Sequence, residues 1–474
     1  MSIIVAKFGG TSMATGHSFR VAASRVARND DIRIAVVSAP GKINGRNDPQ
    51  GKSGQDGVKV TDRLLRIAEK ARKNEPLEED ISALERRFSS IEDSIALPDS
   101  GRVSGKIGEI VRQRARITGE DDAPLAALGE ELNARLFAAY LNMLHIRAEY
   151  LDPMDAGFRV SMHEGRICVD DSQYPEISSK VQKALDQGVR VVFPGFFGYD
   201  ESGAIRTFPR GGSDYTGSVL AAAMRAGMYQ NFTDTDGIRA VEPSIDPGAL
   251  VIRQMTHREL TELTLGGAFG VFQYEAAVPL AIHGVVTQVL DTFDHGSMGT
   301  HILPQVGGSR NEITGIVHRG EFVAFEIIKY GIANAVGFFK QVTGLFESMG
   351  ISFEHAPSSV NDISVIVRKK NLGQMGPADV ASAIRERIRP HQLKIHDLSA
   401  VAIVGEEVSR SPGLGWKVFR AVSEAGVNVP YHNNQGISFV LWLRNGDAEK
   451  AARAIYRDRF GESDGRTSLP ATSA

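Results

Sequence analysis

Near its start the sequence reads Ser2-Ile3-Ile4-Val5-Ala6-Lys7-Phe8-Gly9-Gly10-Thr11-Ser12. The short apolar run with β-branched residues predicts a buried strand. Gly9 and Gly10 have no side chain and tolerate positive φ, so the backbone there can approach a ligand closely. Thr11 and Ser12 supply hydroxyls that can cap a following helix. Backbone N–H groups at such a turn, together with the charge of Lys7, favour a phosphate group, although an ordinary turn has the same pattern.

The composition restricts the class of protein. The chain has 474 residues, 42% hydrophobic and 23% charged, which is typical of a soluble globular protein of about two to four domains. A net charge of −3 gives no electrostatic support for a nucleic-acid partner or an acidic membrane surface. Cys168 is the only cysteine, which excludes an intrachain disulfide and suits a reducing compartment. We see no secretory signal and no apolar run of about 18 residues, so we expect a cytoplasmic protein without a membrane span.

Strand-like and helix-like segments alternate over the first 300 residues or so. Residues 43–57 are rich in Gly, Asn, Asp and Lys and predict an exposed loop. The alternation predicts an α/β fold with a mainly parallel sheet. We expect strands at 32–38, 189–193 and 230–233, and helices at 60–72, 77–95, 123–145 and 218–226.

The pattern changes after a Pro- and Gly-rich break at 303–311. Two β-α-β-β-α units of similar length follow, which indicates an internal repeat. The first has expected strands at 322–329, 351–355 and 362–367 and helices at 336–349 and 377–388. The second has strands at 400–404, 427–431 and 437–443 and helices at 414–425 and 448–460. Because this region lacks a clustered acid, base or nucleophile, we predict a regulatory or dimerising module, with domains at 1–305, 313–392 and 397–465.

Three further segments carry groups suited to chemistry. Arg210-Gly-Gly-Ser-Asp214 places a cation, flexible glycines, a hydroxyl and a carboxylate before a helix, and arginine can bind a carboxylate in bidentate fashion. Thr233-Asp-Thr-Asp-Gly237 ends a strand, where open α/β sheets bind ligands. Glu130 lies on the inner face of a predicted amphipathic helix and could hold an ammonium group. The plain alternatives are a solvated turn with Ser213 as helix cap, an Asp-Gly turn, and a solvated glutamate.

Metal-binding and other nucleotide-binding motifs are missing from the sequence. There is no CxxC, no H-E-x-x-H and no G-x-G-x-x-G after a strand. Gly51-Lys-Ser53 resembles the end of a P-loop but lacks the preceding glycine. We therefore predict no metal site formed by the protein alone.

Together these segments resemble the amino acid kinase superfamily and, within it, the aspartate kinases. The match runs in order over nearly the whole chain, and the tandem repeats resemble paired ACT domains. The segments that carry it are Lys7-Phe-Gly-Gly-Thr-Ser12, Ser38-Ala-Pro-Gly-Lys42, Lys59-Val-Thr-Asp62, Gly129-Glu130, Arg210-Gly-Gly-Ser-Asp214, Thr233-Asp-Thr-Asp-Gly237 and Arg258-Glu-Leu-Thr-Glu-Leu263.

The resemblance implies a three-layer sandwich followed by two ferredoxin-like ACT units, and an allosteric enzyme of amino-acid biosynthesis. Its reaction would transfer the ATP γ-phosphoryl group to the β-carboxylate of L-aspartate, giving 4-phospho-L-aspartate, with Mg²⁺ arriving on ATP. The ACT units imply an amino-acid effector and a homodimer or higher homo-oligomer.

The resemblance also implies a role for each matching residue. Lys7 would hold the transferring phosphoryl group, Gly9 and Gly10 would offer N–H groups, and Asp214 would orient the lysine. The aspartate-binding residues would be Ser38, Glu130, Arg210 and Ser213, and those facing the nucleotide Thr233, Asp234, Asp236 and Arg239.

The sequence also departs from the family pattern. Glu242-Pro-Ser244 stands where Asp-Pro-Arg is frequent, and Arg239 where a tyrosine often stacks near adenine. Residues 269–273 and Asn433-Asn-Gln-Gly-Ile-Ser438 differ as well. Two alternatives therefore stay open: a kinase for another amino-acid carboxylate in a specialised pathway, and a catalytically weak protein that senses an amino acid through its ACT units.

Overall fold

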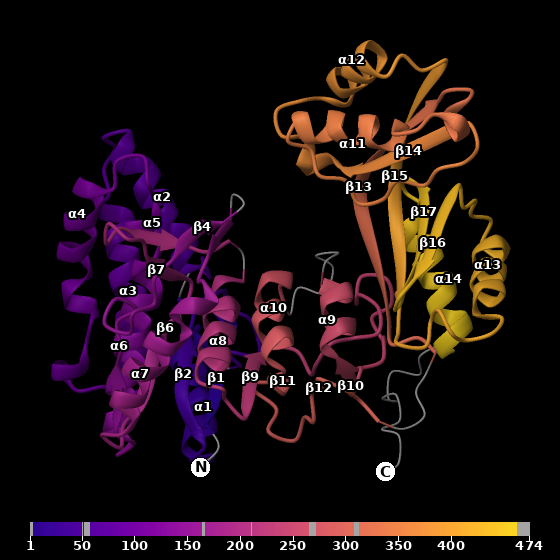
Figure 1. Ribbon diagram of the computed structural model, residues 1–474. Helices are drawn as coiled ribbons and strands as arrows, with labels where there is room; N and C mark the ends of the chain where they lie inside the picture. The colour runs from indigo at the N-terminus through magenta and orange to yellow at the C-terminus, as the bar shows by residue number, and fades with distance from the viewer. Residues whose placement is uncertain are drawn as a thin grey trace.

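The computed structural model describes residues 3–49, 51, 57–163, 166–209, 211–264, 272–307 and 312–461. Within them, eight strands form one sheet in the order β10-β12-β11-β9-β1-β2-β6-β3 (Figure 1). The pairs from β11 to β3 are parallel, and β12 runs antiparallel to β11. The strands are β1 (Ile4–Phe8), β2 (Ile32–Val37), β3 (Ala148–Tyr150), β6 (Arg190–Pro194), β9 (Met228–Thr233), β10 (Gln254–Thr256), β11 (Thr287–Asp291) and β12 (Thr300–Leu303).

Helices cover both faces of this sheet. Val5 of β1 packs in a core with the helices α7 (Tyr174–Leu185), α8 (Gly212–Ala223) and α10 (Tyr274–His283). Ala6 and Phe8 point the other way and pack in a second core. Its helices are α1 (Gly16–Ala27), α2 (Val60–Arg72), α3 (Glu78–Ser94), α4 (Ile107–Ile117) and α6 (Leu128–Met143). Burial on both faces explains why β1, β2 and β6 are mostly apolar. The arrangement confirms the expected α/β sandwich with a mainly parallel sheet.

The helix boundaries explain how the site is built. The helix expected from Ser218 begins earlier, at Gly212, because Gly211 takes the N-cap position with φ 78°. Ser213 therefore lies inside the first turn and caps nothing. Thr11 forms a 3-10 turn with Ser12 and Met13, and the cap of α1 is Thr15 instead. The helix expected at 123–145 is divided into α5 (Ala123–Ala126) and α6.

A second, antiparallel sheet follows in the order β14-β13-β15-β17-β16. β13 (Gly315–Ile328) and β15 (Gln392–Val404) are long enough to serve both repeats. Residues 315–319 pair with 400–404, and 322–328 pair with 392–398 and with β14 (Asp362–Arg368). Figure 1 shows the two strands running from the lobe of α11 (Phe338–Ser348) and α12 (Pro377–Arg387) to that of α13 (Leu414–Glu424) and α14 (Ala448–Phe460). The three domain boundaries stay a prediction.

Two expected strands of the repeats are wrong. At 351–355 only His355 makes an isolated bridge, to Ile366. The buried Ile351 gives the strand-like signal, but its N–H donates to Phe346 at the end of α11. The strand expected at 427–431 is β16 (Tyr431–Gln435), which pairs with β17 (Ser438–Arg444). It begins after Pro430, which has no N–H for a ladder.

Candidate active site

The centre of the site is an ion pair between Lys7 and Asp214. Lys7 lies near the carboxyl end of β1 and Asp214 in the first turn of α8, and their Nζ and Oδ1 atoms are 2.6 Å apart. Asn231 of β9 joins them: its Oδ1 accepts from Lys7 at 3.4 Å and its Nδ2 donates to Asp214 at 3.0 Å. Exposure is 7% for Lys7, 8% for Asp214 and 0% for Asn231. The ammonium group is therefore held in one place by two neighbouring elements.

Sequence reasoning gave Asn231 no role in the site. Its place follows from the sheet, because Lys7 and Asn231 are register partners in the parallel pair of β1 and β9. The adjacent polar residues Gln230 and Asn231 are the one signal in the sequence at 228–233, and it does not single out Asn231.

The turn after β1 depends on the small size of glycine. Neither Gly9 nor Gly10 has a positive φ, so conformational freedom does not explain them. A Cβ on Gly41 would lie 2.5 Å from the carbonyl carbon of Gly10, whose oxygen accepts the Gly41 N–H at 2.8 Å. Gly9 donates its own N–H to Phe232 at 3.1 Å, whereas that of Gly10 has no partner in the described residues. Gly10 is therefore the better N–H donor for a phosphate.

Glu130 is a buried carboxylate on the same edge of the sheet. It lies in the first turn of α6, 4% exposed, and its Oε2 has no hydrogen-bond partner among the described residues. Burial raises the pKa of Glu130 to about 8, and a hydrogen bond with the Ala39 backbone opposes the rise. An unpaired buried carboxylate is a suitable partner for an ammonium group.

Two further predicted aspartate-binding residues, Ser38 and Ser213, lie close to the ends of β2 and β6. Ser38 follows β2, and its carbonyl accepts from Asn133 of α6 at 2.6 Å. Ser213 is 8% exposed, and a Cβ on Gly195, directly after β6, would lie 2.6 Å from its hydroxyl oxygen. Arg210 lies outside the described residues.

The predicted nucleotide-facing residues lie at the end of β9 and directly after it. Thr233 donates its hydroxyl to Asp234 at 3.4 Å. Asp236 and Arg239 form an ion pair of 2.9 Å, and Arg239 also donates to the Ala249 carbonyl at 2.6 Å. This end of the site is open, since the Asp236 side chain is 45% exposed.

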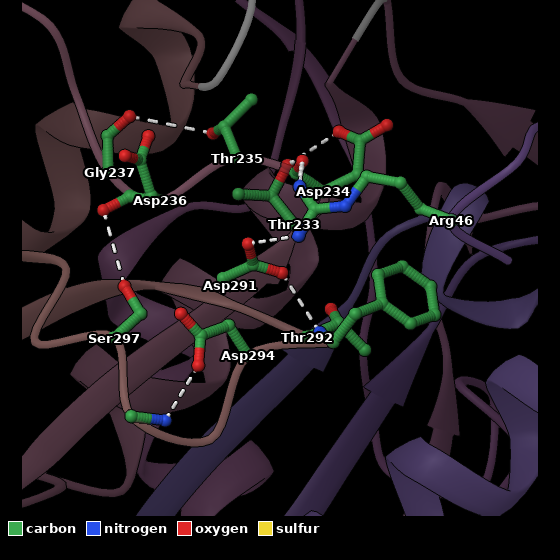
Figure 2. A network of polar contacts seen from close by, with 12 residues as sticks. Arg46, Thr233, Asp234, Thr235, Asp236, Gly237, Asp291, Thr292, Asp294 and Ser297 are labelled. Atoms are coloured by element: carbon green, nitrogen blue, oxygen red, sulfur yellow. Dashed lines mark hydrogen bonds and ion pairs between the residues drawn. The ribbon is translucent and has the colours of Figure 1, made fainter. Parts of the chain in front are cut away.

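Figure 2 shows a second set of residues at the same end that sequence reasoning missed. Arg46, from the loop after β2, contacts the Asp234 carbonyl and the carboxylate of Asp291, at the end of β11. The sequence indicated only an exposed loop around Arg46, and nothing local marks its partners, which lie 188 and 245 positions away.

The described residues contain no group of three His, Cys, Asp or Glu side chains that could hold a metal ion. They also contain no helix long and apolar enough to cross a membrane.

Comparison with known proteins places these features in a family. The model of the amino acid kinase family matches residues 2–289. Aspartokinase 3 of Bacillus subtilis is 30% identical over 467 residues, covering 96% of this chain and 98% of that protein. The crystal structure of Clostridium acetobutylicum aspartate kinase has a TM-score of 0.77 at 26% identity, covering 97% of this chain and 100% of its own. E. coli aspartokinase III in complex with aspartate and ADP has the same fold, with a TM-score of 0.77 at 21% identity and the same coverage. The chain therefore belongs to the amino acid kinase family, in its aspartokinase branch.

Proposed function

We propose that this protein transfers the γ-phosphoryl group of ATP to the β-carboxylate of L-aspartate. A β-carboxylate oxygen forms a bond to the γ-phosphorus, the bond from that phosphorus to the β,γ-bridging oxygen breaks, and ADP leaves with 4-phospho-L-aspartate. The observation that carries the proposal is the buried contact of Lys7 with Asp214 and Asn231, in a chain of the aspartokinase branch.

Lys7 stabilises the charge on the phosphoryl group during transfer. Phosphoryl transfer depends mainly on positioning and charge neutralisation. A lysine fixed by Asp214 at 2.6 Å and by Asn231 is oriented before the substrates arrive. The N–H of Gly10 adds a backbone donor at the same turn.

Glu130 recognises the α-ammonium group of aspartate. Its Oε2 is buried without a partner, so a bound ammonium group satisfies an atom that is otherwise costly to bury. Arg210 binds the α-carboxylate of aspartate. Ser38 and Ser213 also contact the bound aspartate.

ATP and a divalent metal ion are the cofactors, and we propose Mg²⁺ as that ion. Mg²⁺ keeps several waters and takes few protein ligands beside substrate phosphates, which fits a site without a three-residue metal cluster in the described chain. Asp234 and Asp236 would hold it, and it would neutralise phosphate charge. Thr233, Asp234, Asp236 and Arg239 face the nucleotide, whose ADP form is bound in the E. coli structure.

We propose that residues 1–305 are the catalytic domain and that the domains at 313–392 and 397–465 bind an amino-acid effector. The relative from E. coli is named as lysine-sensitive. β14 and β16 are the edge strands of the second sheet, and pairing of ACT sheets between chains would give a homodimer, which light scattering would test. The single cysteine Cys168 supports a reducing compartment, and we propose the cytoplasm.

Trapping of the acyl phosphate with hydroxylamine tests the function. The protein is incubated with Mg-ATP, hydroxylamine and either L-aspartate or another carboxylic amino acid, and hydroxamate is measured. We expect hydroxamate that requires L-aspartate and ATP. Hydroxamate formed with another amino acid but not with L-aspartate would support the specialised kinase. No hydroxamate with any of these amino acids would support the amino-acid sensor.

A further inference from the structure

The loop after β2 is fixed against the first turn of the site. Asn47 is 0% exposed, and its Nδ2 donates to the carbonyls of Thr11 at 3.2 Å and Lys42 at 2.9 Å. Its own carbonyl accepts the hydroxyl of Thr15. The neighbouring Arg46 is thereby directed across the turn toward the ends of β9 and β11.

The guanidinium group of Arg46 has two protein partners there. It donates to the Asp234 carbonyl and, at 2.5 Å, to Oδ2 of Asp291, and it lies 5.8 Å from the ring centroid of Phe293. The Arg46 side chain is 45% exposed, whereas that of Asp291 is 3% exposed. Two of its five N–H donors are engaged in these contacts. The other three have no hydrogen-bond partner among the described residues, and the side chain is 45% exposed, so they are available to an anion.

The surroundings of Arg46 are rich in carboxylates, as Figure 2 shows for Asp234, Asp236, Asp291 and Asp294. Such surroundings repel a polyphosphate unless a cation intervenes. Lys7, which is paired with Asp214, is assigned to the transferring phosphoryl group, so the other phosphates need a further cation beside Mg²⁺.

Two other arginines approach this region, but their contacts differ. Arg25 donates to the backbone carbonyls of Asp291 and Thr292. Arg239 is paired with Asp236. Arg46 thus combines unengaged donors on a half-exposed side chain with a fixed position among these carboxylates.

We propose that Arg46 binds the phosphates of the nucleotide and that Asp291 is a positioning residue that holds the guanidinium group in place. The inference rests on the proposed function, because it takes the end of β9 as the nucleotide site. Arginine suits this task through its fork of N–H donors. The competing explanation is a structural latch, in which Arg46 only ties the loop to Asp291.

Nucleotide binding by calorimetry separates these explanations without relying on turnover. Mg-ADP and adenosine are titrated into the wild type, Arg46→Gln, Arg46→Lys, Asp291→Asn and Arg28→Gln. Arg28, exposed at the end of α1, is the matched control for loss of an arginine. We expect Arg46→Gln to raise the Kd for Mg-ADP about tenfold, the effect of losing a charge-assisted hydrogen bond.

The same change should leave adenosine binding unaltered, because adenosine has no phosphate. Arg46→Lys keeps the charge and should lie between wild type and Arg46→Gln. Asp291→Asn should raise the Kd for Mg-ADP less than Arg46→Gln does, because the Asp234 carbonyl still holds the guanidinium group of Arg46. Arg28→Gln should match the wild type.

Three results would overturn the inference: an unchanged Kd for Mg-ADP in Arg46→Gln, an equal loss for adenosine, or equal losses in Arg46→Gln and Asp291→Asn. A wild type that binds Mg-ADP but makes no hydroxamate would contradict the proposed function alone. A wild type that binds no Mg-ADP would contradict both.

Discussion

The two ends of the site hold their charges in different ways. At the end assigned to aspartate and the transferring group, Lys7, Asp214 and Glu130 are each less than 10% exposed. At the nucleotide end, the side chains of Asp236 and Arg46 are both 45% exposed. Buried charges interact strongly and cannot be replaced by water, whereas exposed ones are screened. We therefore expect turnover and aspartate selection to depend on the buried end, and substitutions at the open end to have smaller effects.

The comparison would break first at Asp214. Asp214→Asn leaves the buried Lys7 without its counter-charge, so we expect turnover to fall about 10²-fold, as for loss of one preorganised electrostatic group. The measurement is the hydroxamate rate at saturating substrates. Asp30→Asn is the matched control, because it removes an ion pair of 2.7 Å with Arg190 whose carboxylate is fully exposed. Equal losses of hydroxamate rate in Asp214→Asn and Asp30→Asn would show that burial of the ion pair does not determine its effect on turnover.

Glu130, at the buried end of the site, should make aspartate binding depend on pH. Its pKa of about 8 means that the empty site holds a proton at neutral pH, while an ammonium group requires the carboxylate. We expect aspartate binding to strengthen as pH rises toward 8 and to release a proton, measured by calorimetry in buffers of different ionisation enthalpy. Glu130→Gln should abolish both effects and raise the KM for aspartate about tenfold. Glu131 lies on the same helix but is paired with Arg114. Glu131→Gln should therefore keep both the pH dependence of aspartate binding and the release of a proton.

The same shift affects stability. The pKa of Glu130 rises from an ordinary 4.5 to about 8 on folding, so the folded state binds more protons between these values. Its contribution to the free energy of unfolding is therefore full below pH 4.5 and is lost as pH rises to 8. Denaturant unfolding of the wild type and Glu130→Gln across this range should show a flatter pH profile in the variant. A profile unchanged by the substitution would contradict the shift.

The sequence predicts the site residues that belong to local motifs, but not those whose role depends on contacts with distant parts of the chain. Lys7, Glu130 and Asp214 belong to local motifs whose order along the chain resembles the aspartate kinases, and this resemblance implies their roles. Asn231 is an ordinary polar residue until the sheet register places it beside Lys7. Asp291 is one until the loop after β2 brings Arg46 to it. Local patterns contain no such long-range pairing.

The fold shows the same limit. Alternating segments predict the parallel sheet, because each strand and helix carries its own periodicity. Both repeats share β13 and β15 because distant residues of these two strands pair with each other. The sequence of one strand does not show such pairing. The strand expected at 427–431 begins only after Pro430, which has no N–H for a ladder, a local signal that apolar content concealed.

A smaller effect tests the close approach of backbones at the buried end. Gly41→Ala places a Cβ 2.5 Å from the Gly10 carbonyl carbon, so we expect a loss of about 1–3 kcal/mol in the free energy of unfolding. Gly45→Ala in the same loop meets nothing within 4 Å and should change stability by less than about 0.5 kcal/mol. Denaturant titration compares the two. Equal stability would contradict the tight packing.

The smallest effect is expected at Arg239, on the open end. Its guanidinium group is engaged by Asp236 and the Ala249 carbonyl, and an exposed pair of this kind contributes little. Arg239→Ala should change the KM for ATP by less than about fivefold and leave the KM for aspartate unaltered. A large rise in the KM for aspartate would show that the two ends are not separate.

The most direct test of the account is the turnover of Lys7→Ala, measured together with its affinity for Mg-ADP. We predict that aspartate-dependent hydroxamate formation falls about 10³-fold, because the fixed cation at the transferring group is lost. Mg-ADP affinity should stay within about tenfold of the wild type, since other residues hold the nucleotide. Turnover within about tenfold of the wild type would contradict the role of the Lys7–Asp214 pair.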